Sequence, residues 1–150
     1  MIELVATVII TVSSVLLFGY WFRYTCLLIL SAKTTRDFAG EVATANQLGF
    51  LEVQSQLRAK GVDLGRLCDA LDRDYAVLAK LMQQAGGPSA EGSSMEKRML
   101  AINYNLTRAW YHVSSHVSTA AARQALEEMS MMVAHFANVM GEQVAGAAAA

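Results

Sequence analysis

The stretch LVATVIITVSSVLLFGYWF, residues 4–22, contains nineteen residues and no charged side chain. Coiled as an α-helix it would be about 28 Å long, close to the thickness of the hydrocarbon core of a bilayer. Tyr20, Trp21 and Tyr24 cluster at its C-terminal end, where aromatic side chains favour the membrane interface. The pattern predicts a transmembrane anchor over residues 1–33, including an interfacial extension.

A signal peptide, a core helix and a lipid anchor each fit this apolar stretch less well. A cleaved signal peptide has a basic start and a small-residue cleavage site, whereas this chain begins Met1-Ile2-Glu3 and the stretch ends in bulky aromatic residues. A buried core helix seldom has so long an uncharged run. A myristoyl anchor requires glycine directly after the initiator, where this chain has isoleucine.

The charges beside the stretch predict its orientation. Glu3 precedes it, and Arg23, Lys33 and Arg36 follow it. Because basic residues favour the cytoplasmic side, we expect a single-pass protein of the cell membrane with its N-terminus outside and its C-terminal region in the cytoplasm. The lipid bilayer is therefore an expected partner.

The remaining chain reads as all-α. It contains a single proline, Pro88, and no alternating β-branched runs closed by turn pairs. The expected fold after the anchor is a three- to four-helix bundle or a helical hairpin. From Thr34 onward there are ten basic and twelve acidic residues with no long Lys/Arg run, so a nucleic-acid partner is not expected.

Residues 34–85 predict a pair of helices. The first spans about residues 34–60, with a shift in apolar phase near Gly49. The second, about residues 63–85, has apolar positions spaced by four and three, which is typical of an amphipathic helix; they are Leu64, Cys68, Leu71, Tyr75, Leu78 and Met82. The acidic residues of this helix, Asp69, Asp72 and Asp74, are interpreted as a solvated face. Residues 86–94 predict a flexible connector.

Residues 95–144 predict one long helix or two. Ser93 and Glu96 have the spacing of a capping box at its start. A first apolar stripe, interpreted as a packing seam, consists of Met99, Ile102, Leu106, Ala109, Val113 and His116; a second consists of Leu126, Met129, Val133, Phe136 and Met140. The two are out of phase, so the helix bends or breaks between them. We favour one bent helix over two joined near Ser118, because Ala120 and its neighbours favour helix. The tail, 145–150, is expected to fray.

Two histidines are the candidates for a metal site. His112 and His116 are four residues apart, a spacing that can share a metal ion. A third ligand could come from Cys68, His135 or a carboxylate on another helix. The Glu-x-x-His pairs typical of di-iron bundles are absent, so both histidines are interpreted instead as packing or interface residues. No cofactor is expected, and the chain has neither a phosphate-binding glycine loop nor a nucleophile elbow, so an enzyme is not expected.

The sequence best fits a membrane-anchored helical interaction protein, an accessory or scaffold subunit of a membrane-associated assembly. Its expected partners are a protein or a second copy of itself. The candidate interaction residues lie on or beside the apolar stripes, or among the methionines near the C-terminus; they are Leu71, Tyr75, Trp110, Met131 and Phe136. The alternative is a single-pass sensor or a metal- or ligand-binding bundle that uses the two histidines.

Overall fold

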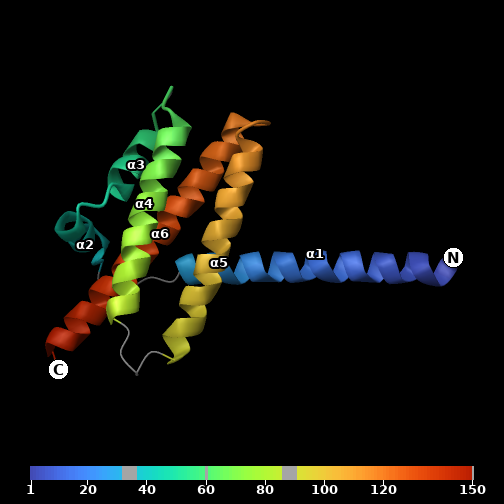
Figure 1. Ribbon diagram of the computed structural model, residues 1–150, viewed down its shortest axis with the longest axis horizontal. Helices are drawn as coiled ribbons and strands as arrows, with labels where there is room; N and C mark the ends of the chain where they lie inside the picture. The colour runs from blue at the N-terminus through green and yellow to red at the C-terminus, as the bar shows by residue number, and fades with distance from the viewer. Residues whose placement is uncertain (32–36, 60, 86–90, 150) are drawn as a thin grey trace. The chain divides into compact units, whose positions relative to one another are not determined.

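The computed structural model describes residues 1–31, 37–59, 61–85 and 91–149 (Figure 1). Within these ranges the chain forms six α-helices and no strand, which confirms the all-α prediction. It divides into two compact units, Met1–Lys33 and Thr34–Ala150.

The first unit is a single helix, α1, spanning Ile2–Ser31. Its most apolar window of 18 residues has a mean hydropathy of 2.2, and none of that window is buried. The hydroxyl groups of Thr7 and Thr11 donate to the carbonyl oxygens of Glu3 and Thr7, each over 2.8 Å. These polar groups are thus satisfied inside the helix. By length and composition, α1 can cross a membrane.

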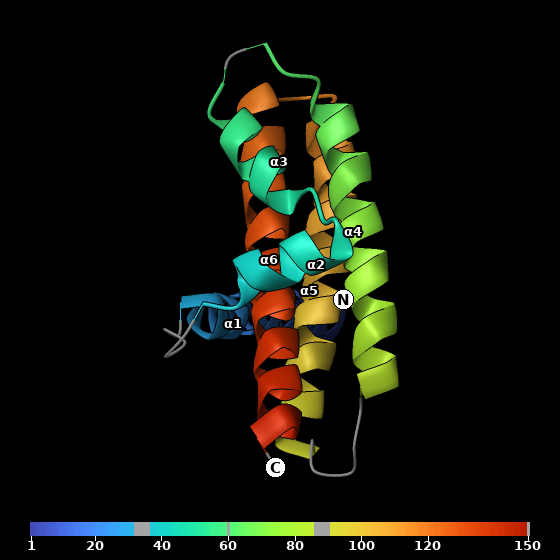
Figure 2. The same cartoon turned by 90° about the vertical axis from the view of Figure 1, so that its left-hand side faces the viewer.

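The second unit is built around its last helix, α6 (Figure 2). Every other helix of the unit packs against α6, and α3 also packs against α4. These helices are α2 (Ala39–Asn46), α3 (Phe50–Leu57), α4 (Leu64–Ala85), α5 (Glu91–Ser114) and α6 (Thr119–Ala149). The second predicted stripe lies on α6, where Leu126, Met129, Val133 and Phe136 are almost completely buried.

The structure divides the first predicted helix in two at Gln47. This residue adopts a left-handed conformation with φ of 54°, which ends α2 in the way helices commonly end. Its backbone N–H and that of Leu48 both donate to the carbonyl of Ala43. Helix α3 then begins after Gly49, where the apolar phase shifts in the sequence. Residues 37–85 therefore contain three helices within the described ranges, not a pair.

Helix α3 is held at both ends by charged side chains of the bundle. The Asp74 carboxylate on α4 accepts the backbone N–H of Gly49 over 2.8 Å, before the first turn. The Arg123 guanidinium on α6 donates to the carbonyls of Leu57 and, over 3.0 Å, Ala59, after the last turn. Each charge has the sign that opposes the helix dipole.

The acidic residues of α4 do not form one solvated face, contrary to the sequence interpretation. Asp69 is exposed, Asp72 is partly buried, and Asp74 is only 5% exposed. Burial raises the pKa of Asp74, and hydrogen bonds from the backbone of Gly49 and Phe50 partly offset this. The interpretation failed because it did not anticipate that α3 needs an acceptor at its N-terminus.

The beginning of the second unit is clamped to α6. The side-chain oxygen of Asn138 accepts the backbone N–H of Phe38 over 2.6 Å. One turn further, a Cβ atom at Gly141 would collide with the Phe38 side chain. Glycine at this position allows the chain to approach the helix closely.

Residues 95–144 form two helices, so the favoured single bent helix was wrong. Helix α5 ends at Ser114, and the hydroxyl of Ser118 accepts the backbone N–H of Ala121 at the start of α6, over 3.4 Å. The N–H of Ser118 donates to the carbonyl of Ser114 over 2.7 Å. Serine favours such caps and turns over helix interiors, and here this preference outweighs the run of alanines.

Both ends of this region extend further than predicted. Helix α5 begins at Glu91, so Ser93 lies inside it and is not its cap. Helix α6 continues to Ala149, where fraying was expected, in keeping with the high helix propensity of alanine. Residues 86–90 of the predicted connector lie outside the described residues.

Candidate functional site

Helix α5 exposes its apolar face. Ile102, Leu106, Trp110 and Val113 are 54%, 57%, 56% and 58% exposed. Met95 extends the face by two turns, and Val117 extends it into the turn that follows α5; both are exposed too. We call these six residues the α5 stripe. The predicted packing seam was therefore wrong, because its large apolar members Ile102, Leu106 and Val113 face outward.

The face of α5 that is buried is largely polar or aromatic. It comprises Leu100, Asn103, Tyr104, Thr107, Tyr111 and Ser114. Several of its polar groups have partners within the unit, as when the Asn103 amide donates to the Met132 sulfur over 3.5 Å. Buried polar groups are tolerated where hydrogen bonds satisfy them. Among the described residues the hydroxyl of Thr107 is an exception, because it is buried without a hydrogen-bond partner.

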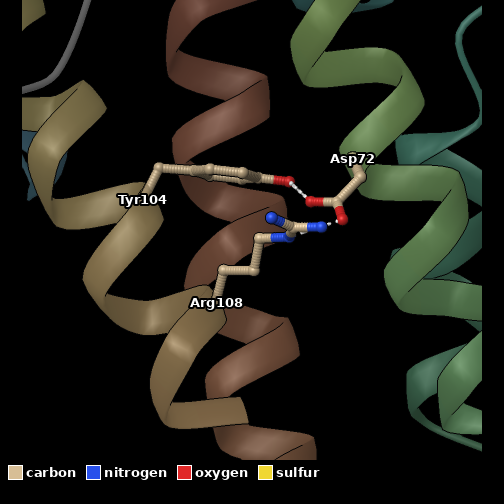
Figure 3. Close-up of polar contacts among 3 residues, drawn as sticks. All are labelled: Asp72, Tyr104 and Arg108. Atoms are coloured by element: carbon tan, nitrogen blue, oxygen red, sulfur yellow. Dashed lines mark hydrogen bonds and ion pairs between the residues drawn. The ribbon is translucent and has the colours of Figure 1, made fainter. Parts of the chain in front are cut away.

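A polar cluster joins α5 to α4 (Figure 3). The Tyr104 hydroxyl donates to one carboxylate oxygen of Asp72 over 3.0 Å, and the Arg108 Nε donates to the other over 2.6 Å. Figure 3 shows both side chains reaching from α5 toward this carboxylate. The side chains of Arg108 and Asp72 are 46% and 23% exposed, so solvent screens the ion pair. The tyrosine contact is the better-protected part of the cluster.

The groups around this cluster are held in their neutral forms. Tyr104 stacks on Tyr75 with ring centroids 4.0 Å apart. Burial, and then the charge of Asp72, raise the pKa of Tyr104 far above its ordinary range. The same two causes raise the pKa of the buried Cys68 thiol to about 11. A neutral phenol and a neutral thiol are poor bases and nucleophiles, so the cluster suits a structural lock better than acid–base or covalent chemistry.

The candidate interaction residues fall into two groups. Leu71 and Phe136 are fully buried in the core, and Tyr75 contacts Phe136 with ring centroids 5.7 Å apart. Trp110 and Met131 are exposed. Only the latter two are available to a partner. Ile102, Leu106 and Val113 are equally available and were missed, because their spacing is the same as that of a buried seam.

The two candidate metal-binding histidines do not lie on one continuous helix. His112 is on α5, exposed and next to the Tyr111 ring, whereas His116 lies in the turn after it. His135, a possible third ligand, contacts the Glu96 carboxylate over 3.2 Å instead. Among the residues that the structure describes, no group of three or more His, Cys, Asp or Glu side chains is placed to hold a metal ion.

An open pocket of about 300 Å³ lies between α3 and α4. Its polar lining comes from Glu52, Gln56, Arg66 and Arg73. These side chains provide one carboxylate, two guanidinium groups and an amide. Comparisons with protein-family models, with curated proteins and with solved structures found no match to this chain.

Proposed function

We propose that this chain is a membrane-anchored helical interaction protein, an accessory or scaffold subunit of a membrane-associated assembly. One observation carries the proposal: the most apolar window of α1 has no buried residue. An apolar helix of this length exposed to water is strongly unfavourable. A bilayer removes the whole surface from water at once and matches its length.

The charges near the anchor support one orientation. Arg23, Lys33 and Arg36 follow the apolar stretch and only Glu3 precedes it. The positive-inside tendency then places the N-terminus outside and the second unit in the cytoplasm.

The second unit supports an interaction role rather than a catalytic one. Two of its carboxylates serve the fold: Asp74 caps α3, and Asp72 joins α4 to α5. The α5 stripe, in contrast, does not serve the packing of the unit, because its apolar side chains are exposed. Exposed apolar patches of this kind are typical of contact sites.

Anchoring is tested by extracting isolated membranes with alkaline carbonate. We expect the full chain to stay in the membrane pellet and the double variant Val12→Asp, Leu16→Asp to be released. A matched control with Leu51→Asp and Val144→Asp, two exposed positions of the second unit, should stay in the pellet. Release of the unaltered chain would overturn the proposal.

The assembly role is tested by purifying the full chain from its native membranes in mild detergent and determining the mass of the complex. A second protein in fixed stoichiometry supports an accessory subunit, and a defined homo-oligomer supports a scaffold. A monodisperse monomer at membrane-like protein densities contradicts both.

A further inference from the structure

The residues of the α5 stripe have the spacing and the composition of a helix face that lies at a membrane interface. Ile102, Leu106, Trp110 and Val113 follow spacings of four, four and three residues, which places them along one side of α5. All four are more than half exposed. A tryptophan among branched aliphatic side chains is typical of helices that lie in the plane of a membrane surface.

On α5 itself the exposed polar side chains beside the stripe are basic or neutral, although carboxylates of α4 lie near Tyr111 and Arg108. Arg98 and His112 are exposed on the same helix. The one acidic residue between 95 and 117, Glu96, contacts His135 on α6. Helix α5, Glu91–Ser114, contains three basic and two acidic side chains, and one of the basic ones, Arg108, is paired with Asp72; the rest of residues 34–150 contains seven basic and ten acidic side chains. The stripe therefore lies on the most basic helix of an otherwise acidic unit.

The chain between the anchor and this unit is short. Helix α1 ends at Ser31, and Phe38 is already fixed to Asn138 of α6. The six residues between them, 32–37, allow a separation of at most about 25 Å even when fully extended. If α1 spans a bilayer, the second unit is confined close to its surface, and confinement raises the effective concentration of the two surfaces.

We propose that the α5 stripe docks on an anionic lipid surface, so that the second unit lies against the membrane that α1 anchors. This inference rests on the proposed function. Apolar side chains of the stripe enter the boundary between headgroups and acyl chains, and Arg98 contacts the lipid phosphates. A second copy of the chain is a weaker occupant, because the short connection to α1 holds the stripe near the lipid surface, whereas a second copy must reach it by diffusion.

The test uses the full chain with Trp21→Phe, which leaves Trp110 as the one tryptophan. It is reconstituted into vesicles of phosphatidylcholine, with or without phosphatidylglycerol, that carry lipids spin-labelled near the headgroup. These lipids are present in both leaflets, so quenching of Trp110 reports contact with lipid whichever way the chain is inserted.

We expect strong quenching and a blue-shifted emission in the anionic vesicles, both reduced by high salt. Arg98→Gln should lower the ratio of docked to undocked unit about fivefold, and Leu106→Asp should abolish quenching. The matched controls are Arg66→Gln and Val77→Asp, exposed positions of α4, and they should leave quenching unchanged. Circular dichroism of each variant shows whether it is folded.

Two results overturn the inference. Trp110 that stays unquenched in anionic vesicles shows that the stripe does not touch lipid. Salt-independent shielding of Trp110 without lipid quenching, together with disulfide formation between chains in which Ile102→Cys provides the one cysteine, shows that a second copy covers it. Flotation separates this failure from failure of the proposed function: a chain that does not float with the vesicles lacks an anchor, whereas one that floats with Trp110 unquenched lacks only the docking.

Discussion

Helices α4 and α5 have apolar stripes of similar spacing but place them differently. On α4 the stripe faces inward, and Cys68, Leu71 and Leu78 are buried. On α5 it faces outward, and Ile102 and Leu106 are more than half exposed. Periodicity therefore shows that a helix has an apolar face but does not show what covers that face. The α4 stripe is covered by other parts of the chain, whereas the α5 stripe is exposed within the described residues.

The way α5 attaches to its neighbours explains the difference. In the described residues, α4 and α5 have no backbone contact of the kind that each makes with α6. The space between them is bridged by large side chains, the stacked rings of Tyr75 and Tyr104 and the ion pair of Asp72 with Arg108. Leucine or isoleucine cannot make these contacts, so the polar and aromatic face of α5 turns inward.

The largest expected effect comes from placing a charge on each stripe in turn. Leu71→Asp should destabilise the second unit by more than about 4 kcal/mol, because it buries an unpaired carboxylate. Ile102→Asp should change the free energy of unfolding by less than about 0.5 kcal/mol. Denaturation of the full chain in mild detergent, followed by near-ultraviolet circular dichroism, measures both. Equal losses would show that the α5 stripe is packed within the chain.

The sequence predicted an apolar stripe correctly where the residues that pack against it lie in the same unit. The buried stripes of α4 and α6 were predicted correctly, since Leu71 and Val133 pack inside the same unit. The left-handed conformation of Gln47 could not be predicted, because glutamine has no special preference for it. The shift in the spacing of apolar residues near Gly49 was the one sign in the sequence that the helix ends there. The break before α6 was visible in Ser114 and Ser118, but the following alanines were given more weight.

Thiol reactivity offers a second way to compare the stripes. A chain with Cys68 as its one cysteine, made by Cys26→Ser, should react with iodoacetamide at pH 8.5 at least about 100-fold more slowly than one with Ile102→Cys and no other cysteine. A pKa of about 11 leaves little thiolate at Cys68, and burial restricts access further. Comparable rates would mean that α4 exposes its stripe transiently.

The polar face of α5 should contribute a smaller but measurable amount. Tyr104→Phe should cost about 1.5–3 kcal/mol, because it removes a hydrogen bond to a charged acceptor. A double-mutant cycle with Asp72→Asn isolates the coupling between the two groups. A coupling energy near zero would mean that stacking alone holds α5 beside α4.

The site was harder to predict than the fold because burial of polar residues depends on their partners. Tyr104 and Arg108 lie on α5, and their acceptor, Asp72, lies 32 and 36 residues earlier on α4. Sequence spacing within one helix gives no information about such a pair. The apolar stripe of α5 was interpreted as a packing seam because the polar partners of its opposite face could not be identified from the sequence. The exposure of Ile102, Leu106 and Val113 therefore became evident only with the structure.

The smallest expected effect concerns Asp74, a charged residue of α4 that is buried where the sequence suggested solvent. Burial raises its pKa in the folded state, so between its ordinary value and the raised one the folded chain binds more protons than the unfolded chain. The stability that Asp74 contributes is therefore greatest below about pH 4 and falls as the pH rises through the folded pKa.

Asp74→Asn has no proton to release, so the unfolding free energy of the unaltered chain minus that of this variant should fall as the pH rises above about 4 and then level off. Asp69→Asn, which removes an exposed carboxylate from the same helix, provides the baseline for the other titrating groups. A difference that rises with pH instead would show that the backbone N–H groups at the start of α3 stabilise the charged carboxylate more than burial destabilises it. In that case the polar contact between α4 and α3 would depend on the charge of Asp74. Helices α4 and α5 would then differ in which polar groups they bury, and not in how many.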